Sequence, residues 1–276
     1  LKKVSIENAT LKLITDKNGR ENFNVWKKSE DGKQADLELN FEEVEFKNVR
    51  LIYDDVSQKK FFDLQLDAAT MKGKFNTANF ELALEGKTYI NKINIIGQDY
   101  ITQKKAILNL QLNVDNVNKV YTFKPSSLKV EGLTLNVEGR YDYSSASPII
   151  DLELKGVDAN LLSLISIIPK GNLGMLADYK ADGNVTFNAN IKGIITAGSS
   201  PAITINFSTA NSQLTPPYGN VTLESISFNG FYTNRKNASG GIGLLQVKNM
   251  QADMDGKKVM ADFEIENNDK PFVNLL

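Results

Sequence analysis

The chain has 276 residues, and its 32 Lys plus Arg against 33 Asp plus Glu leave a net charge of −1, which gives no sign of a nucleic-acid surface. It contains no cysteine and no histidine, which excludes a Cys/His zinc site, a Ser/His/Asp triad, a Cys/His dyad and a cysteine redox couple within this sequence. The length allows one or two domains with an ordinary core.

Short runs of alternating apolar and polar residues fill most of the sequence. In chain order, clear examples are residues 37–41, 107–114, 185–191 and 203–207. Asn-Gly, Asp-Gly and Glu-Gly pairs lie between such runs, and this arrangement is typical of β-strands joined by turns. The sequence therefore predicts an all-β, or at least β-dominated, fold.

The alternation slips by one residue at several places, with Asn or Gly at the slip. In the run from Glu43 to Asp55, Val44 and Phe46 point to one face, whereas Val49 continues the apolar side in the opposite phase. Asn and Gly adopt a left-handed backbone most easily, and an extra residue in that conformation makes a β-bulge or corner that keeps the apolar side on one face. The candidate strand-bend positions are Asn8, Asn48, Gly132, Gly230 and Asn249.

A sheet that bends repeatedly toward one side predicts an elongated, strongly curved groove or half-pipe. The alternation lapses between Asp115 and Ser127, where Pro125 interrupts strand pairing. We therefore expect an N-terminal β-groove unit of residues 1–120 and a C-terminal β unit of residues 121–276, unless the two form one continuous domain.

One stretch has the periodicity of a helix instead. Asp158 is a suitable N-cap and Pro169 a suitable stop, and a second short helix is predicted from Leu173 to Tyr179, so we expect one or two helices near residues 158–179. The apolar stripe of the first helix consists of Leu161, Leu164, Ile165 and Ile168. This helix is too short to cross a bilayer, and it either plugs the sheet or contacts lipid.

The sequence offers little for catalysis or metal binding. The adjacent acids Glu42/Glu43 and Asp54/Asp55 point to opposite faces of a strand, so neither pair forms a glycosidase site. Asp16 and Asp253 begin segments similar to a calcium loop, but the further oxygen ligands and the closing Glu are absent. We predict no catalytic residue, no metal site and no cofactor.

Segments in both halves resemble a known family. A strand that ends in Asp16, turns at Gly19 and resumes at Asn22-Phe23 is similar to a recurring segment of AsmA-like proteins, the TamB-related proteins of the bacterial envelope. The segment from Phe46 to Asp54 resembles the next unit of that family. Further similar segments are residues 161–169, 183–187, 191–193, Pro201 and 247–271.

The resemblance implies a non-enzymatic periplasmic segment of a Gram-negative envelope protein that takes part in outer-membrane assembly or lipid homeostasis. The implied partners are phospholipid or another envelope lipid, carried along an apolar β-groove, and the inner membrane, reached through an N-terminal anchor outside this sequence. The chain starts at Leu1 and ends in an apolar run, so we expect it to be part of a longer protein.

Two other functions are compatible with the sequence. A surface β-sandwich that binds glycans, as an adhesin does, needs an exposed aromatic platform, and the single Trp, Trp26, lies beside a hairpin. A hydrolase that uses only carboxylates needs two acids brought together by the fold. The sequence also leaves open whether the inside of the curve is free for lipid or filled by its own side chains.

Overall fold

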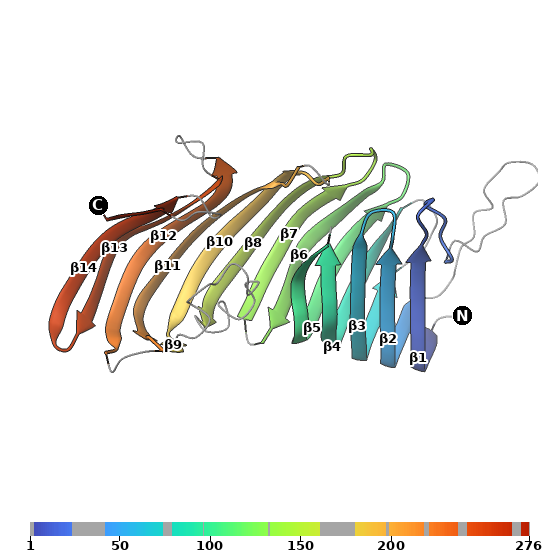
Figure 1. Ribbon diagram of the computed structural model, residues 1–276. Helices are drawn as coiled ribbons and strands as arrows, with labels where there is room; N and C mark the ends of the chain where they lie inside the picture. The colour runs from blue at the N-terminus through green and yellow to red at the C-terminus, as the bar shows by residue number, and fades with distance from the viewer. Residues whose placement is uncertain are drawn as a thin grey trace, which may run out of the picture. The chain divides into compact units, whose positions relative to one another are not determined.

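The computed structural model describes residues 3–23, 42–73, 79–95, 97–131, 133–160, 180–196, 199–217, 221–236, 242–266 and 272–275. Every helix or strand element in these ranges is a β-strand (Figure 1), which confirms the all-β prediction. The strands are β1 (Lys3–Thr15), β2 (Glu43–Asp55), β3 (Lys60–Gly73), β4 (Asn79–Ile95), β5 (Gln98–Asp115), β6 (Val120–Val130), β7 (Leu133–Asp142), β8 (Ile149–Asn160), β9 (Lys180–Asp182), β10 (Asn184–Ile194), β11 (Ala202–Thr215), β12 (Leu223–Lys236), β13 (Ile242–Met254), β14 (Lys257–Glu266) and β15 (Phe272–Leu275).

The order of the strands in the sheet follows the chain, except that β8 is next to β10 and the short β9 pairs with β11. The first pair, β1 with β2, is parallel, and the neighbouring pair β2 with β3 is antiparallel. The chain divides into unit 1, which comprises Leu1–Glu131 and Arg140–Ala146, and unit 2, which comprises Gly132–Gly139 and Ser147–Leu276. Each unit has its own cluster of buried apolar residues.

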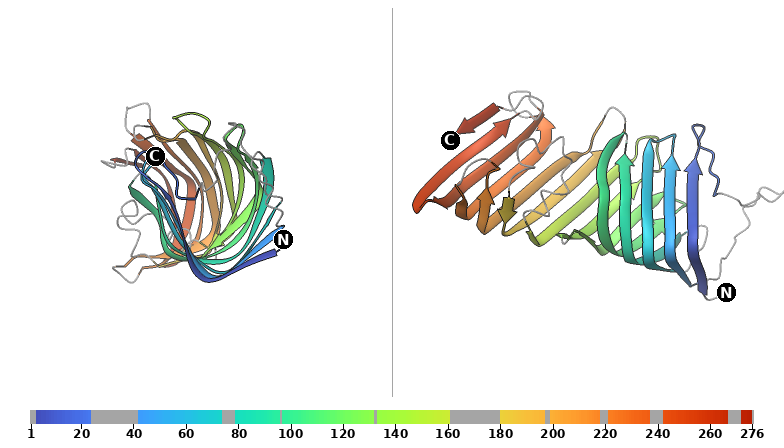
Figure 2. Two further views of the ribbon diagram at one scale, coloured as in Figure 1. Left: turned by 90° about the vertical axis from the view of Figure 1, so that its right-hand side faces the viewer. Right: turned by 60° about the horizontal axis from the view of Figure 1, so that its bottom comes forward.

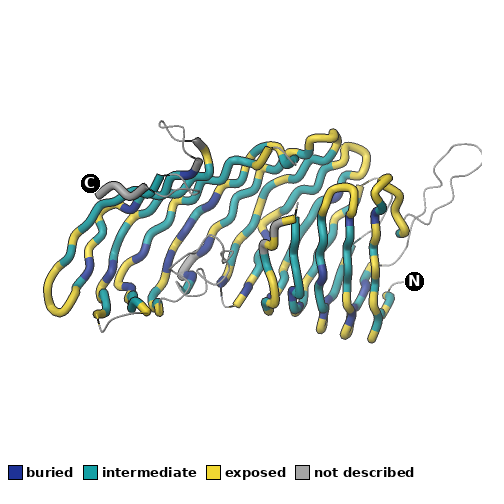
Figure 3. The backbone as a smooth tube through the Cα atoms, viewed as in Figure 1, coloured by how far each residue is buried: buried dark blue, intermediate teal, exposed yellow. Residues whose placement is uncertain are grey.

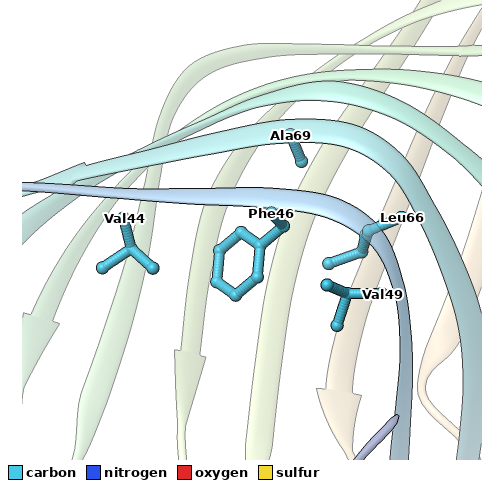
Figure 4. Packing of buried hydrophobic residues seen from close by; sticks show 5 residues of the cluster. All are labelled: Val44, Phe46, Val49, Leu66 and Ala69. Carbon is cyan, nitrogen blue, oxygen red and sulfur yellow. The ribbon is translucent and has the colours of Figure 1, made fainter. Parts of the chain in front are cut away.

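The apolar cluster of unit 1 lies where β2 bends. Val44, Phe46 and Val49 are all buried in it, together with Leu66 and Ala69 of β3. Figure 4 shows these five side chains on the same side of the strands, inside the bend. Asn48 has a φ of 52°. Its left-handed backbone takes up the one-residue slip, so side chains before and after it remain on one face.

The bend runs across neighbouring strands. Asn8 of β1 has a φ of 51° and lies opposite Asn48, because the residues on either side of these two are paired in register. The Nδ2 of Asn48 donates to the Oδ1 of Asn8 at 2.7 Å, and the Nε2 of Gln65 donates to the Oδ1 of Asn48 at 2.9 Å. An asparagine here therefore provides both the backbone conformation and hydrogen bonds to the strands on each side.

The other predicted bend positions divide into three cases. Asn249 has a φ of 53°, as expected, and the pairing of β13 with β14 shifts register beside it. Gly132 lies outside the described residues, but its neighbour Glu131 has a φ of 48°. Gly230 is not among the residues with positive φ; the left-handed residue of β12 is Ser225, with a φ of 51°, and the pairing of β12 with β13 shifts register between Ser227 and Asn229.

Position 230 requires a glycine because of packing and not because of backbone conformation. A Cβ at this position would lie 2.2 Å from Cζ of Phe207 on the neighbouring strand, so the missing side chain makes room for the ring. Gly156 and Phe187 repeat the arrangement, with 2.2 Å between a Cβ at Gly156 and the ring Cε1. Glycine in unit 2 thus permits close cross-strand packing in addition to bends.

The predicted helix start at Asp158 is wrong. Asp158 lies within β8, which pairs antiparallel with β10 from Asn160↔Asn184 to Ile149↔Ile194. β8 and β10 pair on both sides of Asp158, although their register shifts between Val185 and Phe187, and this pairing outweighs a weak local preference for a helix. The predicted stripe residues Leu161, Leu164, Ile165 and Ile168, and the second predicted helix at 173–179, lie outside the described residues. Among the described residues, no helix is long and apolar enough to cross a membrane.

We predict that Asn48→Val lowers the free energy of unfolding by about 1 to 2 kcal/mol, because a β-branched residue is strained at positive φ. Asn48→Gly should cost less, since glycine adopts this φ freely but loses the two amide contacts. Urea denaturation followed by circular dichroism measures both. Asn109→Val is the matched control, since Asn109 is exposed on β5 and is not among the residues with positive φ. An equal cost for the two valine variants would contradict the role of the bend.

We also predict that Gly230→Ala destabilises the chain by about 1 to 3 kcal/mol through its clash with the ring of Phe207. The cost should become small in a Phe207→Ala background, because the ring is then gone. A double-mutant cycle of urea midpoints measures this coupling. If the cost of Gly230→Ala is the same in both backgrounds, the packing explanation is wrong.

Candidate functional site

One face of unit 1, called the apolar face below, is apolar from strand to strand. Strand register aligns its side chains in rows that cross the sheet. One row consists of Val4, Val44, Met71, Leu84 and Leu110, and another of Leu11, Leu51, Leu64 and Ile90. The opposite polar face has rows such as Ser5, Glu45, Thr70, Glu85 and Asn109.

Much of the apolar face is only half-buried. Val44, Val49 and Leu66 are buried, but Leu51 and Leu64 in the middle of their strands remain partly exposed. Figure 3 shows this partial burial along most strands, with short buried stretches separated by residues of intermediate exposure. In the described part of unit 1 every element belongs to the sheet, and none of these elements forms a second layer over this face. A contiguous apolar surface of this kind makes the apolar face the candidate binding surface of unit 1.

Charges on the polar face are paired with one another. The Nζ of Lys3 lies 2.5 Å from a carboxylate oxygen of Glu45, and Lys47 bridges to Glu7 at 3.0 Å. Arg50 holds the buried Asp63 with two hydrogen bonds, of 3.0 Å and 2.7 Å, and these bonds are the main reason that the pKa of Asp63 is lowered. The polar face is therefore suited to contact with water.

An aromatic group lies where the apolar face ends, and we call it the tyrosine cluster. It consists of Tyr53, Phe62, Tyr121, Tyr141 and Tyr143, together with Lys60. The rings of Tyr121 and Tyr143 have centroids 4.9 Å apart, and those of Tyr141 and Tyr143 are 6.0 Å apart. The rings of Tyr53 and Phe62 stack at 5.5 Å. Offset aromatic pairs at these distances stabilise each other beyond the area that they bury.

The tyrosine cluster joins opposite ends of the strands. Tyr53 pairs with Phe62, and this row continues through Ile93 to Ile101 near the start of β5. Tyr121, in contrast, pairs with Val114 at the end of β5. Nevertheless, the Nζ of Lys60, on β3, donates to the Tyr141 hydroxyl at 3.0 Å. The bending of β1 to β5 along their length (Figure 2) brings these two margins of the apolar face together within unit 1.

Lys60 is held among polar and aromatic groups. Its Nζ lies 5.3 Å from the centroid of the Tyr141 ring, a cation–π distance, and it also donates to the Oε1 of Gln58 at 2.5 Å. Its cross-strand neighbour Asp55 is buried, and its carboxylate accepts hydrogen bonds from Ser57 and from the backbone N–H of Gln58. Among the described residues, no carboxylate forms a salt bridge with Lys60.

The phenols of Tyr53 and Tyr143 have raised pKa values. Burial, and next the negative charge of Asp55, raise the pKa of Tyr53 to about 12. Burial and a hydrogen bond with Tyr121 raise the pKa of Tyr143. Neutral phenols donate hydrogen bonds, so the cluster combines one ammonium group with several hydroxyl donors at the end of an apolar surface.

Two hollows lie elsewhere. One of about 1130 Å³ in unit 1 is lined by ends of β3 to β6, including Lys72, Glu81, Gln111 and Asn113. The side-chain oxygen of Asn113 is buried and makes no hydrogen bond within the described part of the chain. The other, of about 450 Å³ in unit 2, is lined by Lys155, Thr186, Phe187, Asn188, Asn206, Phe207, Ser208, Asn229 and Gly230. No group of three or more Asp or Glu residues that could hold a metal occurs among the described residues.

The predicted site residues and the observed features overlap in part. Asn8, Asn48 and Asn249 lie at bends, whereas the four helix residues fall outside the described ranges. The tyrosine cluster was missed, because its members are far apart in the sequence and meet only through the bending of unit 1. One usable signal was Tyr141-Asp142-Tyr143, since aromatic residues two apart on a strand share a face.

No protein-family model, curated protein or solved structure matches this chain. Function is therefore inferred from the geometry and chemistry of the apolar face and the tyrosine cluster.

We predict that alkaline pH weakens the folded chain through Tyr53. Because burial raises the pKa of Tyr53 from 10.0 to about 12, its contribution to stability is fully present below pH 10 and is lost as the pH rises from 10 to about 12. Urea midpoints measured across this range should fall, and Tyr53→Phe should reduce the fall. Tyr89→Phe, on the polar face, is the control. An unchanged pH dependence in Tyr53→Phe would contradict the prediction.

Proposed function

We propose that this chain is a non-enzymatic periplasmic segment of an AsmA-like envelope protein, and that its curved sheets form an elongated groove that binds or conducts lipid in outer-membrane assembly or lipid homeostasis. The observation that carries the proposal is the half-buried apolar face of unit 1, backed by a polar face whose charges pair among themselves. In this proposal acyl chains lie on the apolar face, and the polar face stays in contact with water.

The energetics favour a long apolar ligand. Each methylene removed from water contributes about 0.8 kcal/mol, so a chain that covers several rows gains substantially from shallow contact alone. The rows are regular, because each neighbouring strand adds another aliphatic side chain about 4.8 Å away. Such a surface has few polar groups to fix one ligand shape, which suits flexible acyl chains better than a rigid small molecule.

Unit 2 offers a second surface of the same chemistry. Cross-strand pairing aligns one row made up of Leu154, Ala189, Ile205, Tyr232, Leu245 and Ile265. The next row includes Phe187 and Phe207, which cover Gly156 and Gly230. Because unit 2 has an apolar face of its own, the proposal does not depend on how the two units are arranged.

The family part of the proposal is supported by the local structure of the segment that resembles AsmA-like proteins. Asp16 accepts hydrogen bonds from the backbone N–H groups of Asn18 and Arg20, which forms the turn at Gly19. The side chain of Asn22 then accepts from the N–H of Ile14 and donates to the carbonyl of Lys12. The motif thus ends β1 and occupies part of its open edge, a reason for such a segment to recur in a long sheet.

The second candidate function, glycan binding, is supported by the hollow of unit 2. Strand register places Thr186, Asn188, Asn206, Ser208 and Asn229 on the face opposite the apolar rows, and all five line this hollow. Amides and hydroxyls are the groups that bind sugar hydroxyls. Binding on a glycan array that is lost in Asn206→Ala would favour this function.

Lipid binding predicts that phospholipid accompanies the protein purified from a bacterial membrane fraction, where mass spectrometry of an organic extract detects it. Leu51→Gln should lower the bound lipid by about tenfold, because it puts an amide into the apolar face. Ile52→Gln is the matched control, since Ile52 is the next residue of β2, is equally half-buried and points to the polar face.

Circular dichroism and urea midpoints show whether both variants fold equally well. Absence of phospholipid from the wild-type chain, or equal losses in the two variants, would contradict lipid binding at the apolar face.

A further inference from the structure

The tyrosine cluster contains a cation for which the described part of unit 1 supplies no ion-pair partner. Lys60 lies at the margin of the apolar face, half-buried, with its ammonium bonded to Tyr141 and Gln58 and with no carboxylate within salt-bridge distance among the described residues. The contacts of this ammonium are two neutral oxygens and an aromatic ring, so an anion can still bind to it directly.

The neighbouring phenols complete the chemistry of an anion site. Tyr141 is bonded to the ammonium group through its hydroxyl, and the rings of Tyr121 and Tyr143 pack against it. Phenol hydroxyls can donate hydrogen bonds to phosphate oxygens, and hydrogen bonds to a charged acceptor are the stronger ones. Aromatic residues also favour a position between an apolar and a wet region, which is where the headgroup of a bound lipid lies.

We propose that the tyrosine cluster binds the phosphate of a phospholipid headgroup, with Lys60 as its counter-ion and the hydroxyls of Tyr141 and Tyr121 as hydrogen-bond donors, while the acyl chains lie along the apolar face. The inference rests on the proposed lipid-binding function and adds to it a headgroup class and a place for the headgroup.

The acidic neighbours restrict the charge of that phosphate. The buried carboxylate of Asp55, the cross-strand neighbour of Lys60, lies 3.4 Å from the hydroxyl of Tyr53 and brings a negative charge to the cluster. Glu21 and Asp115 add to the negative potential at the phenols of Tyr53 and Tyr143. Such a potential opposes a second negative charge on the ligand. A phosphodiester with one charge, such as that of phosphatidylglycerol, fits better than a phosphomonoester, which carries between one and two charges at neutral pH.

The test compares detergent-solubilised dioleoylphosphatidylglycerol, dioleoylphosphatidic acid and dioleoylglycerol, which share their acyl chains, by native mass-spectrometric titration of the full chain. Lys60→Gln should weaken binding of dioleoylphosphatidylglycerol about tenfold and leave dioleoylglycerol unchanged. Tyr141→Phe should have a smaller effect of the same selectivity, since the ring remains. Lys60→Arg should retain most of the binding. Lys12→Gln, an exposed cation on the polar face, is the control.

The outcomes separate the two levels of the proposal. If the wild-type chain binds none of the three lipids, the proposed function fails and the headgroup site fails with it. If all three bind equally well, and Lys60→Gln changes nothing or weakens all of them equally, the apolar face binds lipid but the headgroup site is wrong. Tighter binding of phosphatidic acid than of phosphatidylglycerol would overturn the restriction to a single charge.

Discussion

The structure depends on one constraint: a strand that bends must still keep its apolar side chains on one face of the sheet. The period of two in a strand makes any one-residue insertion turn the apolar set outward, unless the inserted residue itself changes the direction of the backbone. Asn48 meets this requirement with a φ of 52°, and Asn8 does so beside it. Val44, Phe46 and Val49 consequently share one cluster although they lie on both sides of the bend.

The features of unit 1 on which the proposed function rests follow from this bend. A flat sheet would keep the row of Tyr53 and the row of Tyr121 at opposite ends of the strands. The bent sheet instead lets Lys60 reach Tyr141 and assembles the tyrosine cluster. The apolar face then ends in a group of aromatic rings, hydroxyls and a cation. A lipid has the corresponding order of parts, from apolar acyl chains to a polar headgroup.

Bends and close packing use different residues for different reasons. Asparagine is placed where positive φ and amide hydrogen bonds are both needed, as between Asn48, Asn8 and Gln65. Glycine at 230 is instead required by the ring of Phe207, although its sequence context suggested a bend. The same local pattern of apolar residues around Gly or Asn therefore served two purposes, and the choice between them depended on what the neighbouring strand places opposite.

Some residues with positive φ lie outside the repeated pattern of apolar residues around Asn or Gly, so that pattern does not predict them. Gln103, Asn211 and Ser225 have positive φ without the flanking spacing that identified Asn48. Between Thr209 and Ser212, the register of β11 against β12 shifts beside Asn211. Such shifts are decided by the pairing of two strands, so one strand's own sequence does not reveal them.

The sequence by itself determined the all-β class, the turns at Gly19 and Gly256, and the bends at Asn8, Asn48 and Asn249, because these depend on the period of a strand and on the backbone freedom of single residues. The Glu85-Gly86 pair, which predicted a turn, instead lies inside β4. It did not exclude a helix starting at Asp158, since local periodicity is blind to the pairing of β8 with β10. Only the tertiary structure decided which residues meet across unit 1. Lys60 and Tyr141 come together through the summed bending of several strands, and no local pattern encodes that sum.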